Sequence, residues 1–161
     1  MQVLIMRHGD AVPEAASDSQ RPLSARGYDE SQKMAYWLNN QAVNIDRVLV
    51  SPYLRAQQTL AAMRDILPLS AEDECLPELT PGGNAKLVGY YLQTLAKEGT
   101  GAVLVISHLP LVGYLVAELC PAETAPMFAT SAIACVSVDS HSGDGVFDWQ
   151  VGPSQLAHKS S

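Results

Sequence analysis

Three short apolar segments, at residues 3–6, 47–51 and 102–106, constrain the fold of this 161-residue chain more than any other feature. Each is rich in valine, leucine and isoleucine and shorter than an ordinary helix, which predicts strands buried on both faces. Segments whose apolar residues recur at helical spacing separate them. Such alternation with short connections predicts an α/β fold, in which helices cover both faces of a mostly parallel sheet.

The C-terminal part of the sequence departs from this alternation. Residues 133–138 and 146–151 flank the turn sequence Ser-Gly-Asp-Gly at 142–145, which predicts a hairpin at a sheet edge. A brief strand is also expected within residues 74–79, where the pattern is short.

Helix starts and domain limits follow from local signals. Ser24 and Asn84 each precede a segment with helical apolar spacing, and both residue types favour the N-cap position. No linker or internal repeat divides the chain. We interpret residues 1–151 as a single catalytic domain and residues 152–161 as a polar, loose C-terminal tail.

Charge and cysteine content exclude several classes of protein. Seventeen acidic residues against ten basic ones give a net charge of −7, which disfavours nucleic acid and anionic membranes as partners. The three cysteines, Cys75, Cys120 and Cys135, are far apart and predict neither a disulfide framework nor a zinc site. The first apolar segment is too short for a signal peptide. We therefore expect a protein of the reducing cytoplasm.

Polar side chains follow each of the three predicted parallel strands. Arg7 and His8 come directly after the first strand, Arg55 follows the second by a few residues, and His108 follows the third. Because the carboxyl ends of parallel strands meet at one edge of a sheet, these side chains are expected to converge. Two imidazoles and two guanidiniums beside helix N-termini are typical of a phosphate site.

These segments resemble the signature of the histidine phosphatase superfamily, also called phosphoglycerate-mutase-like. The matching elements are Arg7-His8-Gly9 closing a strand, Ser-Pro-x-x-Arg-Ala-x-Gln-Thr at 51–59 opening a helix, and His108 after a late strand. Residues 21–24, 76–81 and 105–110 are further similar to the small bacterial phosphohistidine phosphatases of that superfamily. The resemblance extends to about residue 151. It implies a six-stranded mixed sheet between helices, a three-layer sandwich.

The resemblance also implies roles for individual residues. His8 would be the nucleophile that forms a phosphohistidine enzyme, which water then hydrolyses. Arg7, Arg55 and Arg21 would bind the phosphoryl oxygens, and His108 would hydrogen-bond to them. A nucleophilic imidazole needs one unprotonated nitrogen, so the other nitrogen is expected to donate to a backbone carbonyl. Neither a metal nor a cofactor is implied.

The resemblance leaves the general acid unassigned. Some members of the superfamily carry an aspartate directly after the second histidine, but Leu109 stands there in this chain. Glu78 is a candidate acid, although a structural loop explains it equally well, and Asp18 is a weaker candidate. A protonated phosphoimidazole can release neutral imidazole, whereas a sugar alkoxide needs a proton donor. A weak acid therefore favours phosphoramidate substrates over phosphoesters.

Chain length favours a protein substrate. Between Arg55 and Ala102 there is room for the rest of one helix, a short strand and another helix, with none left for a lid. We therefore predict a phosphohistidine phosphatase that acts on a histidine-phosphorylated signalling domain of a two-component phosphorelay and releases inorganic phosphate. The alternatives are a small-molecule phosphomonoesterase of the same superfamily and a phosphoprotein-binding module with little turnover. The presence of His8, Arg55 and His108 argues against the last.

Overall fold

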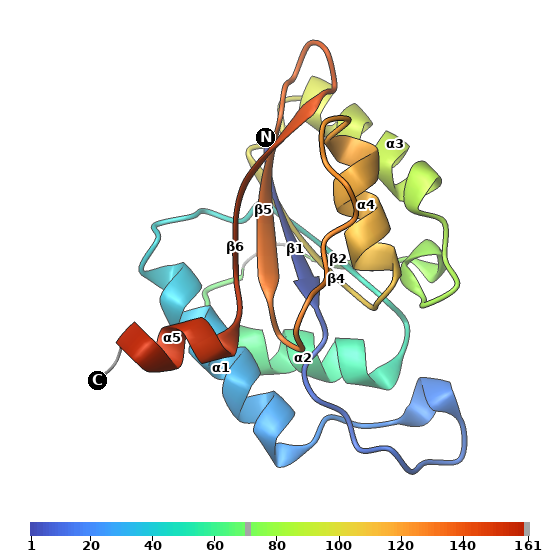
Figure 1. Ribbon diagram of the computed structural model, residues 1–161, viewed down its shortest axis with the longest axis vertical. Coiled ribbons are helices and arrows are strands. Elements are labelled where there is room, and N and C mark those ends of the chain that lie inside the picture. The colour runs from blue at the N-terminus through green and yellow to red at the C-terminus, as the bar shows by residue number, and fades with distance from the viewer. Residues whose placement is uncertain (70–71, 160–161) are drawn as a thin grey trace.

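A computed structural model of the chain describes residues 1–69 and 72–159 (Figure 1). Its strands form a six-stranded sheet in the order β3-β2-β4-β1-β5-β6. The strands are β1 (Gln2–Arg7), β2 (Arg47–Val50), β3 (Asp73–Cys75), β4 (Ala102–Ser107), β5 (Ile133–Val138) and β6 (Gly145–Val151). Strands β1 to β4 pair in parallel, whereas β5 runs antiparallel to β1 and β6 antiparallel to β5. The predicted mixed sheet and the hairpin at its edge are confirmed.

Helices pack on both faces of this sheet (Figure 1). They are α1 (Ala25–Asn39), α2 (Leu54–Arg64), α3 (Ala85–Lys97), α4 (Leu111–Leu119) and α5 (Pro153–Lys159). Helices α3 and α4 cover one face, and α1 and α2 cover the other. The α/β three-layer sandwich predicted from the sequence is therefore confirmed.

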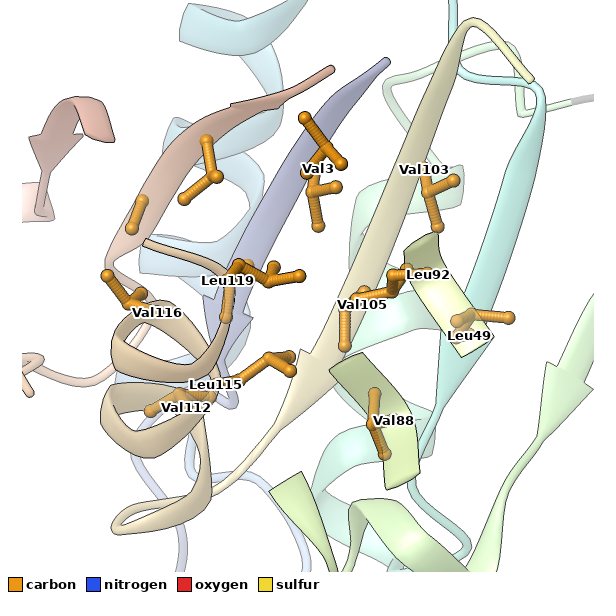
Figure 2. Close-up of a cluster of buried hydrophobic side chains, with 14 of the residues drawn as sticks. Val3, Leu49, Val88, Leu92, Val103, Val105, Val112, Leu115, Val116 and Leu119 are labelled. Carbon is orange, nitrogen blue, oxygen red and sulfur yellow. The ribbon is translucent and has the colours of Figure 1, made fainter. Parts of the chain in front are cut away.

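Two apolar clusters fill the layers because strand side chains alternate between the faces. In β1, Val3 and Ile5 belong to the cluster under α3 and α4, and Leu4 and Met6 belong to the cluster under α1 and α2. All four side chains are fully buried. Figure 2 shows the first cluster, where Val3 and the valines of β4 face the side chains of α3 and α4. Burial on both faces explains why these strands are continuous apolar runs.

Both predicted helix caps are present. The Ser24 side chain accepts a hydrogen bond of 3.0 Å from the backbone N–H of Gly27 at the start of α1. The Asn84 side chain accepts one of 3.0 Å from the N–H of Leu87 at the start of α3. Each cap satisfies one backbone donor that the first helical turn leaves unpaired.

Two segments differ from the sequence-based expectation. The short strand β3 lies at Asp73–Cys75, and a 3₁₀ turn, η2 (Pro77–Leu79), occupies most of the segment where a strand was expected. Residues 152–161 were expected to form a loose tail, but α5 begins at Pro153, a residue that suits a first helical turn. The Leu156 side chain packs against the cluster under α1 and α2, which accounts for this helix. The division into a domain at 1–151 and a tail stays a prediction.

The three cysteines are all free thiols. Cys120 and Cys135 are buried free thiols, and Cys75 is an exposed one. Over residues 1–69 and 72–159, no helix has both the length and the apolar character that crossing a membrane requires.

Candidate active site

Three adjacent strands deliver the predicted residues to one edge of the sheet. Strand β4 lies between β2 and β1, and all three run in the same direction. The backbone N–H of His8 donates to the carbonyl of Ser107 over 2.9 Å, and the N–H of Ser51 donates to that of Ile106 over 3.1 Å. His8, Ser51 and His108 are therefore the first residues beyond three neighbouring strand ends, as the sequence predicted.

Hydrogen bonds define the tautomer of the His8 ring. Nδ1 lies 2.7 Å from the carbonyl oxygen of Gly9, and a carbonyl can only accept, so Nδ1 carries the proton. Arg55 Nε donates to His8 Nε2 over 3.2 Å, which requires a lone pair on Nε2. Both contacts describe the same neutral imidazole. This is the arrangement expected of a nucleophile whose Nε2 attacks an electrophile.

The surroundings also keep the His8 ring neutral. Burial is the main cause that lowers the pKa of His8 to about 4, and its side chain is only 7% exposed. The hydrogen bond to Gly9 opposes this shift, while the positive charges of Arg55 and Arg7 add to it. At neutral pH the ring therefore retains the lone pair that nucleophilic attack needs.

His108 faces His8 from the end of β4. The two ring centroids are 4.9 Å apart, and His108 Nε2 lies 2.7 Å from the hydroxyl of Ser51. Burial, and then the charges of His8 and Arg55, lower the pKa of His108 to about 3. Its Nδ1 is buried without a hydrogen-bond partner among the described residues. A buried polar atom without a partner is unfavourable, and it is typical of a site that a ligand completes.

Arg55 lies in the first turn of α2 and is almost fully buried. Besides the contact to His8, its Nη1 donates to the backbone oxygen of Asp18 over 2.6 Å and its Nη2 to Asp18 Oδ2 over 3.2 Å. The guanidinium carbon lies 5.0 Å from the centroid of the Tyr53 ring, which packs against the His108 ring in a T-shaped arrangement. These contacts hold a cation directly beside the lone pair of His8.

Arg7 approaches the site from the end of β1. Its Nη1 donates to the carbonyl of Phe128 over 2.9 Å, which ties the guanidinium to the Pro-containing loop before β5. Burial lowers the pKa of the Arg7 guanidinium, and the charge of Asp10 opposes that effect. Arg7 Nε is buried and has no partner among the described residues. It is a second buried donor that an anionic ligand would satisfy.

Arg21 is linked to Arg55 by the carboxylate of Asp18, which accepts hydrogen bonds from both side chains. Its Nη1 donates to Asp18 Oδ1 over 3.0 Å and its Nε to the carbonyl of Val12 over 3.0 Å. The hydrogen bond from Arg21, with a further contribution from Arg55, lowers the pKa of the Asp18 carboxyl. Asp18 is thus held as a carboxylate, the opposite of what a proton donor requires. The structure therefore argues against Asp18 as the acid.

Glu78 lies on the 3₁₀ turn η2, in a groove shared with α3. Within the described part of the chain, its half-buried carboxylate makes no hydrogen bond or ion pair. The turn itself is fixed to the site, because Ser107 Oγ donates to the carbonyl of Leu79 over 2.6 Å. Its role as an acid stays a prediction.

Two positioning residues were not assigned a role from the sequence. Thr59 Oγ1 accepts from the N–H of Gly9 over 2.9 Å and donates to the carbonyl of Arg55 over 2.7 Å. The N–H of Ser131 donates to the carbonyl of His8 over 3.1 Å. Thr59 is part of the motif at 51–59, and its position in that motif was the only available signal. In the sequence, no pattern marks Ser131.

The described residues contain no cluster of side chains suited to binding a metal ion. Across residues 1–69 and 72–159, no three histidine, cysteine, aspartate or glutamate side chains are grouped so that they could hold a metal ion.

Known histidine phosphatases are similar to this chain in sequence. The sequence model of the histidine phosphatase superfamily (branch 1) matches residues 3–83, and the chain belongs to this superfamily. The phosphohistidine phosphatase SixA of Escherichia coli is 64% identical over 156 residues, which cover 97% of this chain and 96% of that protein. The SixA homolog of Haemophilus influenzae is 38% identical over 151 residues, covering 89% of this chain and 92% of the homolog.

A solved structure of the protein histidine phosphatase SixA complexed with tungstate has the same fold. It superposes with a TM-score of 0.95 at 63% sequence identity, covering 97% of this chain and 99% of that one. The family and the fold predicted from the sequence are therefore confirmed.

Proposed function

We propose that this protein is a phosphohistidine phosphatase that hydrolyses the P–N bond of a histidine-phosphorylated signalling domain in the cytoplasm. The observation that carries the proposal is the neutral His8 ring, with its Nε2 lone pair beside the buried cation of Arg55. The similarity to phosphohistidine phosphatase SixA over 97% of the chain supports the same activity. Tungstate, present in the related SixA structure, is a tetrahedral oxyanion like phosphate.

The first chemical step would transfer the phosphoryl group to His8. Arg7, Arg55 and Arg21 would bind its oxygens, and His108 would donate a hydrogen bond to one of them. As His8 Nε2 attacks in line, the Arg55 Nε–H exchanges its acceptor: its hydrogen bond to His8 Nε2 is replaced by one to a phosphoryl oxygen. The P–N bond of the substrate breaks, and its electron pair returns to the substrate imidazole. The positive charge that develops on the His8 ring is stabilised by the Nδ1–H bond to a backbone carbonyl.

The second step would hydrolyse the phosphohistidine enzyme. Water attacks the phosphorus, the P–N bond breaks, and its electron pair returns to His8 Nε2. The product is dihydrogen phosphate, which then loses a proton to solvent. Neither step needs an acid on the leaving group, because a ring that already carries a proton leaves as neutral imidazole. Among the described residues, no carboxylate is hydrogen-bonded to either ring nitrogen of His108. A site without such an acid fits a phosphohistidine substrate better than a phosphoester.

A protein substrate fits the limited cover over the site. Between the end of α2 and the start of β4, the described residues form only β3, η2 and α3. Among these described residues there is no inserted segment of the kind that encloses a small substrate. We infer that the partner is a histidine-containing phosphotransfer domain or a similar domain, with inorganic phosphate as the product.

The test compares substrate classes directly. We expect wild-type protein to release phosphate from a histidine-phosphorylated phosphotransfer domain faster than from any member of a sugar-phosphate panel, and His8→Ala to abolish this release. A rapid quench should trap a phosphoenzyme that is labile in acid and stable in base. Faster hydrolysis of a sugar phosphate would favour a small-molecule phosphatase. An adduct that persists in His8→Ala would remove His8 as the nucleophile.

A further inference from the structure

Asp18 is the first residue of the 3₁₀ turn η1 (Asp18–Gln20), which lies between β1 and α1. Its Oδ2 accepts from Arg55 Nη2 over 3.2 Å, and its Oδ1 accepts from Arg21 Nη1 over 3.0 Å. One carboxylate therefore joins two of the three arginines assigned above to the phosphoryl oxygens. The Arg55 side chain is 5% exposed, whereas that of Asp18 is 58% exposed.

The edge of the Arg55 guanidinium that meets Asp18 is the edge that a phosphoryl group would use. Nε–H and one N–H of Nη2 point in parallel along one side of the guanidinium plane and form a fork for two oxygens. In this structure Nε donates to His8 Nε2 and Nη2 donates to Asp18 Oδ2. Phosphorus bonded to His8 Nε2 would bring its oxygens to this same fork. Both present acceptors must then give way.

We propose that Asp18 is a positioning residue that holds Arg55 and Arg21 with its carboxylate until a phosphoryl group displaces it, and that it thereby limits the affinity of the site for free phosphate. This inference rests on the proposed function, because it takes the phosphoryl group to bind at His8 and Arg55. A carboxylate and a phosphoryl oxygen compete for the same charge-assisted hydrogen bonds. Competition of this kind favours release of the inorganic phosphate product.

The surroundings of Asp18 suit displacement better than a permanent structural role. The carboxylate is mostly exposed and lies on a three-residue turn, so water can replace Arg55 and Arg21 when it moves. The Arg21–Asp18 pair is partly exposed on both sides, and exposed ion pairs contribute little to stability. The backbone carbonyl of Asp18 also accepts from Arg55 Nη1, and this contact is independent of the side chain. Substituting the side chain therefore leaves one anchor of Arg55 in place.

The experiment measures binding of inorganic phosphate to Asp18→Asn by calorimetry. We expect the Kd for phosphate to fall about fivefold to tenfold relative to wild type, since a neutral amide competes less well for the guanidiniums. In hydrolysis of a phosphohistidine protein, the inhibition constant of phosphate should fall by the same factor. Glu14→Gln is the matched control, because it removes the same charge from an exposed position in the same loop. It should leave the phosphate Kd unchanged.

Several outcomes would overturn the inference. An unchanged or higher Kd for phosphate in Asp18→Asn would show that the carboxylate does not compete. An equal fall in Glu14→Gln would show a general effect of net charge. Arg55→Ala separates this inference from the proposed function. If phosphate binds wild type and Arg55→Ala equally well, the proposed function fails, and the inference about Asp18 fails with it. If binding depends on Arg55 but not on Asp18, the inference alone fails.

Discussion

Substitution of Thr59 in α2 should show whether catalysis requires its hydrogen bond to the backbone next to His8. The Thr59 side chain is fully buried, and its hydroxyl makes both of the hydrogen bonds described above, to the Gly9 N–H and the Arg55 carbonyl. Thr59→Val keeps the shape of the side chain but removes the hydroxyl. The buried N–H of Gly9 then has no acceptor, which costs about 2 kcal/mol in the free energy of unfolding.

The same substitution should impair catalysis through the orientation of His8. Gly9 follows His8 directly, and its carbonyl holds the proton of His8 Nδ1. When the Gly9 N–H loses its anchor, the imidazole loses a defined direction of attack. We expect kcat on a phosphohistidine protein to fall about tenfold or more, with a smaller change in KM, because misplacement of reacting groups mainly affects the chemical step.

Urea unfolding followed by circular dichroism, together with steady-state kinetics, provides the assay. Thr59→Ser retains the hydroxyl and removes one methyl group, so it should lose about 1 kcal/mol and most of kcat should remain. Thr94→Val is a second control, since it removes an exposed hydroxyl that donates to the Tyr90 carbonyl one helical turn earlier. It should change stability by less than about 0.5 kcal/mol. The reasoning is refuted if Thr59→Val matches Thr59→Ser in both stability and kcat.

The site also predicts the effects of pH, of removing each arginine and of neutralising Glu78. Burial lowers the pKa of His8 to about 4 and that of His108 to about 3, so the stability contributed by these neutral rings is complete above pH 6.5 and is lost as pH falls. Urea unfolding should show a loss of about 1.4 kcal/mol per pH unit for each histidine between pH 6.5 and 4, and a flat profile would contradict the assignment. Arg7→Ala and Arg55→Ala should each lower turnover about a hundredfold while circular dichroism shows an intact fold, and near wild-type turnover would remove that arginine from the phosphate site. Glu78→Gln should retain most activity on a phosphohistidine protein and lose more on an alkyl phosphate, and loss of both activities in a folded variant would make Glu78 essential.

The sequence by itself determined the elements and the edge at which the site forms. Ser24 and Asn84 cap the helices predicted to follow them, because a cap depends on residues three positions apart. The buried strands were predictable because burial on both faces requires continuous apolar runs. Their parallel direction then placed His8 and His108 at one sheet edge. These features depend on local sequence and on general rules of connection.

Only the tertiary structure decided how the side chains of the site are held. Thr59 reaches Gly9 across 50 residues of sequence, and Asp18 reaches Arg55 across 37. Such contacts depend on how α2 packs against the loop after β1, which no local pattern encodes. Helix α5 was missed for a related reason, because Leu156 alone is too weak a signal until a neighbouring apolar cluster gives it somewhere to pack. Periodicity reports which face of an element is buried, whereas the partner across that face is set by the assembled fold.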